Sequence, residues 1–240
     1  MSIIKLNATS STNDYLKTLS KNQSLKNYTV VLADEQTNGR GQMGTTWSSE
    51  KGKNLIMSVL IKNVMSDIQH IFYLNMAVSL SVVQVLESLK LENIAIKWPN
   101  DIMAGNKKIA GILIENTIKP DNCIDTIIGI GLNVNQENFN NLPKATSLYC
   151  YCGKTFNIEE ICKQIVAVLQ NNVSKLLENH TFQKEYHQYL YRKDIPSVFS
   201  VNNLQFMGII VGVNSEGKLQ IKDETDTVTN YSLKEVALLS

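Results

Sequence analysis

The fold is decided by two apolar runs near the middle of the chain, KIAGILIEN at residues 108–116 and CIDTIIGIGLNV at residues 123–134. Both runs are rich in β-branched residues, and a polar link containing Pro120 separates them, so they predict two paired strands. The second run contains Gly129 and Gly131, and glycines weaken a strand interior unless another group approaches its backbone closely. The pair therefore predicts part of a sheet on which something packs closely.

Strand and helix patterns alternate on both sides of this pair. Further expected strands cover residues 28–33, 55–61, 94–97, 205–213, 218–222 and 227–232, and expected helices cover residues 67–89, 158–178 and 181–190. Ser11 and Asp14 have capping-box spacing and mark the start of another helix. The short strands after Pro196 are typical of a small β-barrel. We predict a mixed α/β domain over residues 1–191 and a small β domain over residues 192–240.

The composition of the chain argues against several classes of protein. The chain has 240 residues, of which 43% are hydrophobic, enough for a sizeable core. Its 23 basic and 22 acidic residues give a net charge of +1, which argues against non-specific nucleic-acid binding. No apolar stretch approaches the length of a membrane span, and the first twenty residues lack the apolar run of a signal peptide. We therefore expect a cytoplasmic protein that binds neither membrane nor nucleic acid.

The four cysteines do not predict a metal site. Cys150 and Cys152 form a C-x-C pair, but no second pair follows at the spacing of a zinc site, and the three histidines are scattered. In a cytoplasmic chain thiols stay reduced. We expect free thiols, and the ligands of any metal stay unknown at this level.

A glycine-rich segment, Gly39-Arg40-Gly41-Gln42-Met43-Gly44, is the strongest candidate for a site. Such a loop admits a ligand close to the backbone, and its N–H groups can form an anion nest. An ordinary hairpin turn is the alternative. Only two of the 23 basic residues are arginine, so a guanidinium in this loop favours recognition of a carboxylate or phosphate.

Two lysine-bearing segments are further candidates. Lys97-Trp98-Pro99-Asn100-Asp101 ends a short strand with groups suited to a polyphosphate and a nucleobase, although Pro-Asn-Asp is also a common turn. Lys108 precedes two small residues on an apolar strand, where an ammonium can hold a developing negative charge. Solvated surface is the alternative for this lysine.

Together these segments resemble the bacterial biotin–protein ligases. The resemblance rests on the order GRGQMG, KWPND, KKIAGILIE and IGIGLN, on the opening Ser-Ser-Thr-Asn at residues 10–13, and on the terminal β module. It implies an α+β fold like that of class II aminoacyl-tRNA synthetases, with a mixed sheet flanked by helices and a C-terminal SH3-like β-barrel. No winged-helix segment precedes the first motif, which resembles the stand-alone form of the ligase.

The resemblance implies a two-step reaction. Biotin and MgATP give biotinyl-5′-AMP, which then acylates a lysine of a biotin carboxyl carrier protein domain, as in acetyl-CoA carboxylase or a related carboxylase. It implies biotin, ATP and Mg²⁺ as ligands, and a monomer or homodimer. Because the mixed anhydride hydrolyses readily, a loop that orders over the ligand must keep it dry.

The resemblance also assigns site residues. Arg40 and Lys108 are the catalytic pair, with Lys108 neutralising the biotin carboxylate and the α-phosphate together. The biotin set is Ser11, Thr12, Asn13, Gln36, Gly39, Arg40, Gly41, Gln42, Lys108, Gly111, Gly129 and Gly131. The nucleotide set is Arg40, Trp47, Lys97, Asn100, Asp101, Lys108 and Asn133.

One position departs from the family pattern, which often has a second arginine where this chain has Gln42. We hypothesise that retention of the adenylate depends more heavily on Arg40 and Lys108 here. Two alternatives to a biotin ligase stay open: a lipoate–protein ligase, which shares the fold and the adenylate chemistry, and a non-catalytic biotin-binding regulator. We expect structural roles for Trp98, Cys162, His187 and Arg192, the last in an ion pair.

Overall fold

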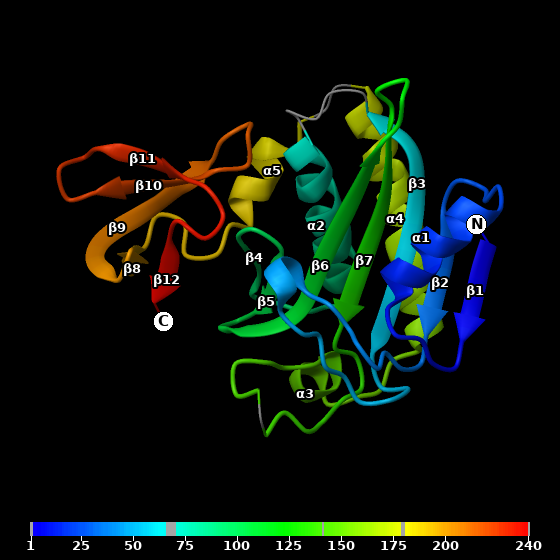
Figure 1. Cartoon of the computed structure of the whole chain (residues 1–240). Helices are drawn as coiled ribbons and strands as arrows, with labels where there is room; N and C mark the ends of the chain where they lie inside the picture. The colour runs from blue at the N-terminus through cyan, green and yellow to red at the C-terminus, as the bar shows by residue number, and fades with distance from the viewer. Residues whose placement is uncertain (1, 66–70, 141, 179–180, 240) are drawn as a thin grey trace.

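The computed structural model describes residues 2–65, 71–140, 142–178 and 181–239. A seven-stranded mixed sheet forms its larger part, in the order β1-β2-β3-β7-β6-β5-β4 (Figure 1). Its strands are β1 (Ser2–Leu6), β2 (Thr29–Ala33), β3 (Leu55–Met65), β4 (Ile94–Lys97), β5 (Asp101–Ala104), β6 (Lys107–Ile118) and β7 (Ile124–Leu132). The antiparallel pair β6–β7 lies inside the sheet, where the two apolar runs predicted it.

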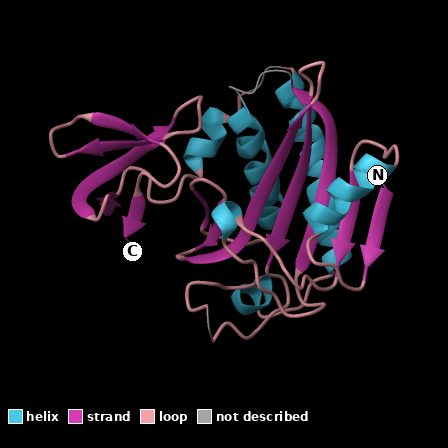
Figure 2. Cartoon of the chain, in the orientation of Figure 1, coloured by secondary structure: helices cyan, strands magenta, loops and turns pink. Residues whose placement is uncertain are grey.

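Helices cover both faces of this sheet (Figure 2). The helices are α1 (Thr12–Asn22), α2 (Ile71–Ser88), α3 (Leu148–Cys152), α4 (Ile158–Leu177) and α5 (Gln183–Gln188). The long helices α2 and α4 pack on one face and share the main apolar core with the sheet. On the other face, Leu16 of α1 packs with Val31 and Leu60 in a small separate cluster. Ser11 caps α1 by accepting a hydrogen bond from the Asp14 N–H, as its spacing predicted.

Helix α2 owes its composition to its central position. It is long and apolar enough to cross a membrane, but 67% of it is buried inside the protein. Residues 66–70 lie outside the described residues, so the predicted start of this helix at 67 is not tested. Cys162 is fully buried on α4 and packs in the same core, as predicted.

A second, five-stranded sheet follows at the C-terminal end. Its order is β11-β10-β9-β8-β12, with β8 (Pro196–Val201), β9 (Leu204–Val213), β10 (Leu219–Asp223), β11 (Val228–Tyr231) and β12 (Ala237–Leu239). Over the described residues this sheet stays open between β11 and β12, so the prediction of a barrel is wrong in that detail. The sheet curls around the stacked rings of Phe199 and Phe206. The domain boundary at residue 192 falls in the turn between α5 and β8 and stays a prediction.

Two side chains fasten this C-terminal sheet to the rest of the protein. The Trp98 indole N–H donates to the Gly217 carbonyl at 2.9 Å, and the Val213 N–H donates to His187 Nε2 at 2.8 Å. Both residues thus have the structural contacts predicted for them, and Trp98 also lines the cavity described below. Arg192 donates to Ser197 Oγ at 2.9 Å, and no ion pair joins it to another described residue, so the predicted ion pair stays a prediction.

Candidate active site

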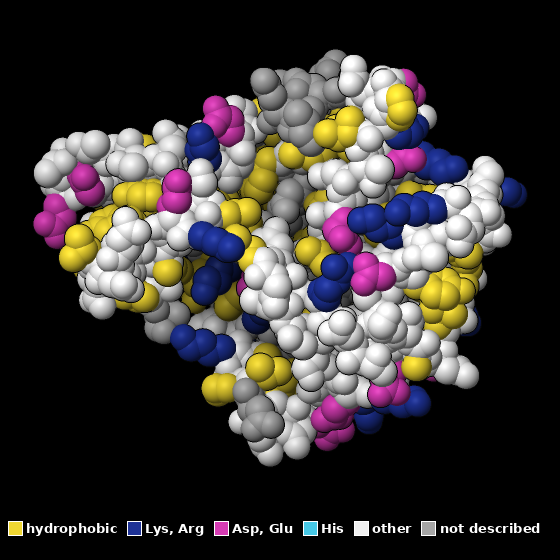
Figure 3. Space-filling model, viewed as in Figure 1, with side chains coloured by type: hydrophobic (Ala, Val, Ile, Leu, Met, Phe, Trp, Pro, Cys, Tyr) yellow, Lys and Arg dark blue, Asp and Glu magenta, His cyan; other side chains and the backbone are white. Residues whose placement is uncertain are grey.

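A cavity of about 540 Å³ lies between the two sheets, a volume typical of small-molecule sites. Figure 3 shows apolar side chains in the hollow between the C-terminal sheet and the larger sheet, with basic side chains around it. The lining includes Ser11, Thr12, Asn13, Gln36, Arg40, Gly41, Gln42, Trp47, Lys97, Asn100, Asp101, Lys108, Gly111, Gly129 and Gly131. The structure therefore brings most of the predicted site residues to one place.

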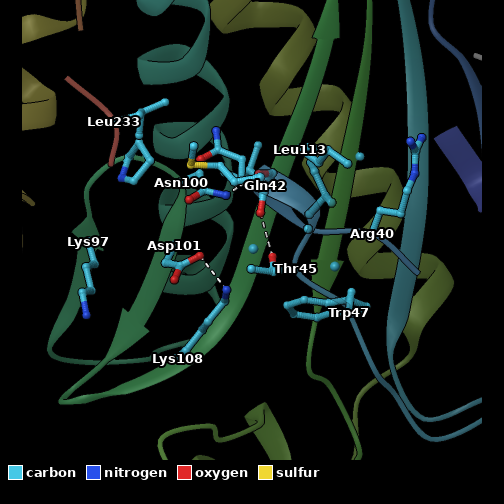
Figure 4. A pocket seen from close by; sticks show the side chains of 18 of the residues that line it. Arg40, Gln42, Thr45, Trp47, Lys97, Asn100, Asp101, Lys108, Leu113 and Leu233 are labelled. Atoms are coloured by element: carbon cyan, nitrogen blue, oxygen red, sulfur yellow. Dashed lines mark hydrogen bonds and ion pairs between the residues drawn. The ribbon is translucent and has the colours of Figure 1, made fainter. Parts of the chain in front are cut away.

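The charged end of the cavity, defined by Lys97, Asp101 and Lys108, is organised by the β5–β6 hairpin. Lys108 Nζ lies 2.6 Å from the Asp101 carboxylate (Figure 4), and both side chains are part-exposed. The Lys108 main chain is held by the following loop, because its N–H donates to the Lys144 carbonyl at 2.7 Å and its carbonyl accepts from Thr146 at 2.9 Å. The backbone of Lys108 is thus held in place, and its ammonium has a protein carboxylate as its partner.

Lys97 adds a second positive charge on the same side of the cavity. Its side chain is half-buried, and burial lowers the pKa of its ammonium. The carboxylate of Asp101 opposes that shift, while the positive charges of Lys144 and Lys108 add to it. Several ammonium groups around one carboxylate leave this region short of negative charge, which suits an anionic ligand.

Arg40 stands in a hairpin formed by the glycine-rich segment. The Gly41 N–H donates to the Thr45 carbonyl at 2.7 Å and the Trp47 N–H to the Gly39 carbonyl at 2.9 Å, and residues 42–44 form a single 3₁₀ turn. The guanidinium lies 2.5 Å from Asp14 and 3.4 Å from Glu115. In Figure 4 it points away from the Asp101–Lys108 pair. In this structure, therefore, protein carboxylates hold the guanidinium that sequence reasoning assigned to a ligand.

The three glycines of the floor admit protein side chains. A Cβ on Gly131 would lie 2.4 Å from the Trp47 ring, and one on Gly129 would lie 2.6 Å from Asn13 Oδ1. Gly111, paired with Gly131 across β6 and β7, would meet the same indole at 3.1 Å. Trp47 therefore packs against the strand backbones at these glycines, and its Nε1 is buried without a hydrogen-bond partner. Lys108 Nζ sits 5.6 Å from the centre of its ring.

The neutral end of the cavity, defined by Thr12, Asn13 and Gln36, is joined by hydrogen bonds to Ser58, which is buried behind it. Gln36 Oε1 accepts from the Thr12 N–H at 2.8 Å and lies 3.0 Å from Thr12 Oγ1. Ser58 Oγ lies 2.7 Å from Thr12 Oγ1 and 2.5 Å from Asn13 Oδ1. Asn13 Nδ2 donates to Glu115 at 2.7 Å. The side-chain oxygens of Gln36 and Asn13 thus both have hydrogen-bond partners in the protein.

Two predicted residues do not line the cavity. Asn133 is buried behind it, where Nδ2 donates to the Thr146 carbonyl and fixes the loop that holds Lys108. Gly39 lies at the base of the hairpin. Asn100 does line the cavity, but its Nδ2 donates to the Ile112 carbonyl at 2.8 Å. Asn100 and Asn133 therefore use these amides to support the backbone near the site.

Sequence reasoning missed part of the lining. The C-terminal domain contributes Ile210, Leu219, Leu233, Lys234, Val236, Ala237 and Leu238, and Ile56, Met57 and Leu113 are among the further lining residues. Figure 4 shows Leu233 across the cavity from Leu113. Apolar side chains from distant segments carry no local pattern that marks them as ligand contacts. Ser58, which lies behind the lining, was also missed, because it meets Thr12 and Asn13 only in the folded chain.

Comparison with known proteins identifies the family. Residues 6–135, more than half of the chain, match the family model of the biotin/lipoate A/B protein ligases. The chain belongs to this family. The predicted resemblance is thus confirmed, and so is the predicted fold class, apart from the open C-terminal sheet.

Individual relatives extend the likeness over the whole chain. The bifunctional ligase/repressor BirA of Bacillus subtilis is 30% identical over 228 residues, which are 87% of this chain and 64% of that protein. The chain thus spans less than two thirds of the length of this relative. The biotin–[acetyl-CoA-carboxylase] ligase of Mycobacterium tuberculosis is 36% identical over 122 residues, 50% of this chain and 44% of that one. The structure of a biotin protein ligase from Aquifex aeolicus, in complex with biotin and ATP, is 27% identical with a TM-score of 0.82 and covers 99% of this chain and 98% of that one.

Proposed function

We propose that this protein is an ATP-dependent biotin–protein ligase that makes biotinyl-5′-AMP and transfers the biotinyl group to a lysine of a biotin carboxyl carrier protein domain. The observation that carries the proposal is the single cavity in which a neutral hydrogen-bonding end and a lysine-rich end lie on one glycine-floored surface. Such a cavity fits a ligand with a polar ring, an apolar chain and a carboxylate that meets a phosphate.

In the first step a carboxylate oxygen of biotin attacks the α-phosphorus of ATP. A new P–O bond forms, the bond to the β-phosphate breaks, and pyrophosphate leaves. Two anions must approach each other, so an ammonium between them lowers the barrier by charge stabilisation and by positioning. Lys108 is placed for this role, since its backbone is held on both sides and its side chain reaches the cavity. Its present partner Asp101 must yield to the substrates.

Arg40 serves the same step from the other side of the cavity. Its contacts with Asp14 and Glu115 are part-exposed ion pairs, which contribute little stability. A bound phosphate offers the guanidinium a bidentate partner of higher charge. We therefore expect Arg40 to leave these carboxylates when the adenylate forms, and the hairpin of residues 39–47 to order over the ligand.

In the second step the amine of the carrier lysine attacks the acyl carbon of the adenylate. An amide bond forms, the bond to AMP breaks, and the amine loses a proton. Until the carrier arrives the anhydride must be protected from water. The apolar side chains that the C-terminal sheet adds to the wall, among them Leu233 and Leu238, are placed to exclude it.

Mg²⁺ would enter with ATP as part of the substrate. This ion keeps several waters and binds phosphate oxygens together with one or two carboxylates. Asp101 is the only acidic residue among the described residues that line the cavity. It would therefore hold the ion from the protein side. Biotin would use Thr12 and Gln36 at the neutral end, and the adenine would stack near Trp47.

The biological setting is part of the proposal. We place the protein in the cytoplasm, acting as a monomer or homodimer on a carrier domain of acetyl-CoA carboxylase or a related carboxylase, without binding nucleic acid or membrane. In the Bacillus relative a ligase is joined to a repressor. A filter-binding assay with genomic DNA tests whether this chain also binds DNA, and retention of DNA at physiological salt contradicts the proposal on that point.

The proposed activity is tested by pyrophosphate release from ATP with the purified protein and no carrier. We expect release with biotin and none with lipoate. Release with lipoate alone assigns the protein to the lipoate branch of its family, and tight biotin binding by calorimetry without release favours a binding role. Transfer is then tested with a carrier domain and its lysine-to-alanine variant as the control.

A further inference from the structure

Two methionines in the described part of the chain have exposed side chains. Met43 is 50% exposed and Met207 is 41% exposed, whereas Met57, Met76 and Met103 are buried. An oxidant must reach the sulfur of a thioether, so exposure decides which methionine is oxidised first. Met43 and Met207 are therefore the two thioethers most open to a peroxide in solution.

These two methionines differ in their place in the fold. Met43 lines the candidate active site, whereas Met207 lies on β9 in the C-terminal sheet and is not part of that lining. Met43 stands at the tip of the glycine-rich hairpin, where its backbone is left-handed with φ 59° and ψ 30°. A side chain in that conformation costs free energy and persists only where the surrounding structure holds it. The Gln42 carbonyl holds the turn by accepting from the Thr45 N–H at 3.2 Å and from the Thr45 hydroxyl at 2.8 Å.

The hairpin tip is open beside this side chain. Gly44 has a φ of 81°, and a Cβ placed on it would meet no heavy atom within 4 Å. The turn thus presents the Met43 thioether to the cavity and leaves it within reach of solvent.

An apolar wall stands in the same cavity. Leu233, Val236 and Leu238 of the C-terminal domain line it together with Met43. A methionine side chain is unbranched and flexible, so it packs well on an irregular apolar surface. When the hairpin of residues 39–47 orders over the ligand, the Met43 thioether can pack on this wall and exclude water from the anhydride.

A sulfoxide cannot take the same place at low cost. In the oxidation a peroxide oxygen is transferred to the sulfur: an S–O bond forms, the O–O bond breaks, and water leaves. The sulfur loses two electrons, which the peroxide takes up. The product is a polar group, and burying it without a hydrogen bond costs free energy.

We propose that Met43 is a peroxide-sensitive modification site, at which formation of the sulfoxide prevents the hairpin from closing over the adenylate. The proposal rests on the proposed function, because the property that oxidation removes is retention of the adenylate. The oxidation leaves the ammonium of Lys108 and the guanidinium of Arg40 unchanged. A methionine sulfoxide reductase converts the sulfoxide back to the thioether, so the loss is reversible.

The test treats the wild-type protein, Met43→Leu and Met207→Leu with hydrogen peroxide. Dithiothreitol then reduces oxidised forms of the free cysteines and leaves methionine sulfoxide in place. Mass spectrometry locates the sulfoxides, and filtration measures the dissociation rate of the adenylate before and after treatment. We expect dissociation to become about tenfold faster in the wild-type protein and in Met207→Leu. Met43→Leu should keep the rate of its own untreated sample, and the reductase should restore the wild-type protein.

Two further measurements separate this role from general oxidative damage. Met43→Gln places a polar group of similar length at the tip, so it should lose the adenylate faster without any peroxide, while thermal unfolding shows that it is folded. Biotin and ATP together should slow sulfoxide formation at Met43 by about threefold or more and leave Met207 unaffected, because only the first side chain becomes covered.

Three results overturn the proposal. The first is an equal loss of adenylate in oxidised Met43→Leu, and the second is a Met43 sulfoxide that leaves the dissociation rate unchanged. The third is equal protection of both methionines by the ligands. If the untreated protein forms no adenylate, the proposed function fails first, and the role of Met43 in retention fails with it.

Discussion

The two ends of the cavity are built in opposite ways. At the neutral end, Thr12, Asn13 and Ser58 are buried and bonded to one another by uncharged groups. At the charged end, Lys108 is part-exposed and paired with Asp101, and on the other side of the cavity Arg40 is likewise part-exposed and paired with Asp14. Rearranging a buried network of neutral groups costs free energy, because each lost hydrogen bond leaves an unsatisfied group. Part-exposed ion pairs exchange partners at little cost. The neutral end is therefore set before a ligand arrives, whereas the charged end is assembled by the ligand.

The largest effect is expected from removal of Lys108. Lys108→Ala should lower the rate of biotin-dependent pyrophosphate release by roughly a hundredfold to a thousandfold, the loss typical of a preorganised charge in a dry site. Biotin binding at the neutral end should change far less, which would separate the two ends. The measurement is a steady-state assay beside calorimetry.

Lys107→Ala serves as the control for Lys108, since Lys107 is the exposed neighbour on the same strand. Lys107→Ala should keep the wild-type rate of pyrophosphate release and the wild-type affinity for biotin. An equal loss of binding and rate in Lys108→Ala would show that this lysine supports the whole cavity and not the charged end alone.

Removal of Arg40 should have the next largest effect. Because Gln42 contributes no charge beside it, Arg40→Ala should slow adenylate formation and speed adenylate dissociation, each by about tenfold or more. The rates are followed with radiolabelled ATP and by filtration of the complex. Unchanged rates would refute our hypothesis about adenylate retention.

A second variant sharpens this prediction. In a Gln42→Arg background another guanidinium is available in the hairpin, so Arg40→Ala should cost less than it does in the natural chain. Asp14→Asn is the matched variant that removes the charge of the carboxylate paired with Arg40. Since it releases Arg40 from its carboxylate, it should leave adenylation intact or slightly faster.

A methyl group on the floor should disturb the two ends differently. In Gly131→Ala the new Cβ would overlap the Trp47 ring, which cannot move into the strand backbones, so the indole must lift. ATP binding should weaken about tenfold while biotin binding falls less. Indole fluorescence reports the displacement. Trp47→Phe removes Nε1, one of the overlapping atoms, and should restore part of the lost ATP affinity. If it restores none, the weaker ATP binding does not come from the overlap with Trp47.

Whether a helix or strand could be predicted from the sequence depends on whether the residues that define it lie close together along the chain. The strands at 94–97 and 55–61, the capped start of α1 and the buried helices follow from local patterns, and the structure confirms them. β5 was missed because Pro99-Asn100-Asp101 reads as a turn, although pairing with β6 makes it a strand. β1 (SIIKL) and β12 (ALL) are short edge strands without apolar/polar alternation, and their partners define them.

The candidate site shows the same division. Residues with rare chemistry in local motifs, such as Arg40 and Lys108, could be found without a structure. The partners of Arg40 could not, because Asp14 and Glu115 meet its guanidinium only in the folded chain. The three glycines Gly111, Gly129 and Gly131 line the cavity, and the side chains that approach their backbones could not be predicted. Sequence reasoning reserved their space for a ligand, whereas Trp47 and Asn13 occupy it here.

The smallest expected effect comes from Lys97. Burial lowers the pKa of its ammonium below the ordinary lysine value of 10.5, so this side chain loses its charge at a lower pH than an exposed lysine does. ATP affinity should therefore weaken by a few-fold as the pH rises through the alkaline range. Lys97→Arg keeps a charge throughout that range and should move the loss to higher pH. Biotinamide, which has the same ring but no carboxylate, is the control ligand, since no titrating group stands among the residues of the neutral end. If the affinities of ATP and biotinamide weakened together, the protein would be losing its fold, and the contrast between a charged and a neutral end would not explain the pH dependence.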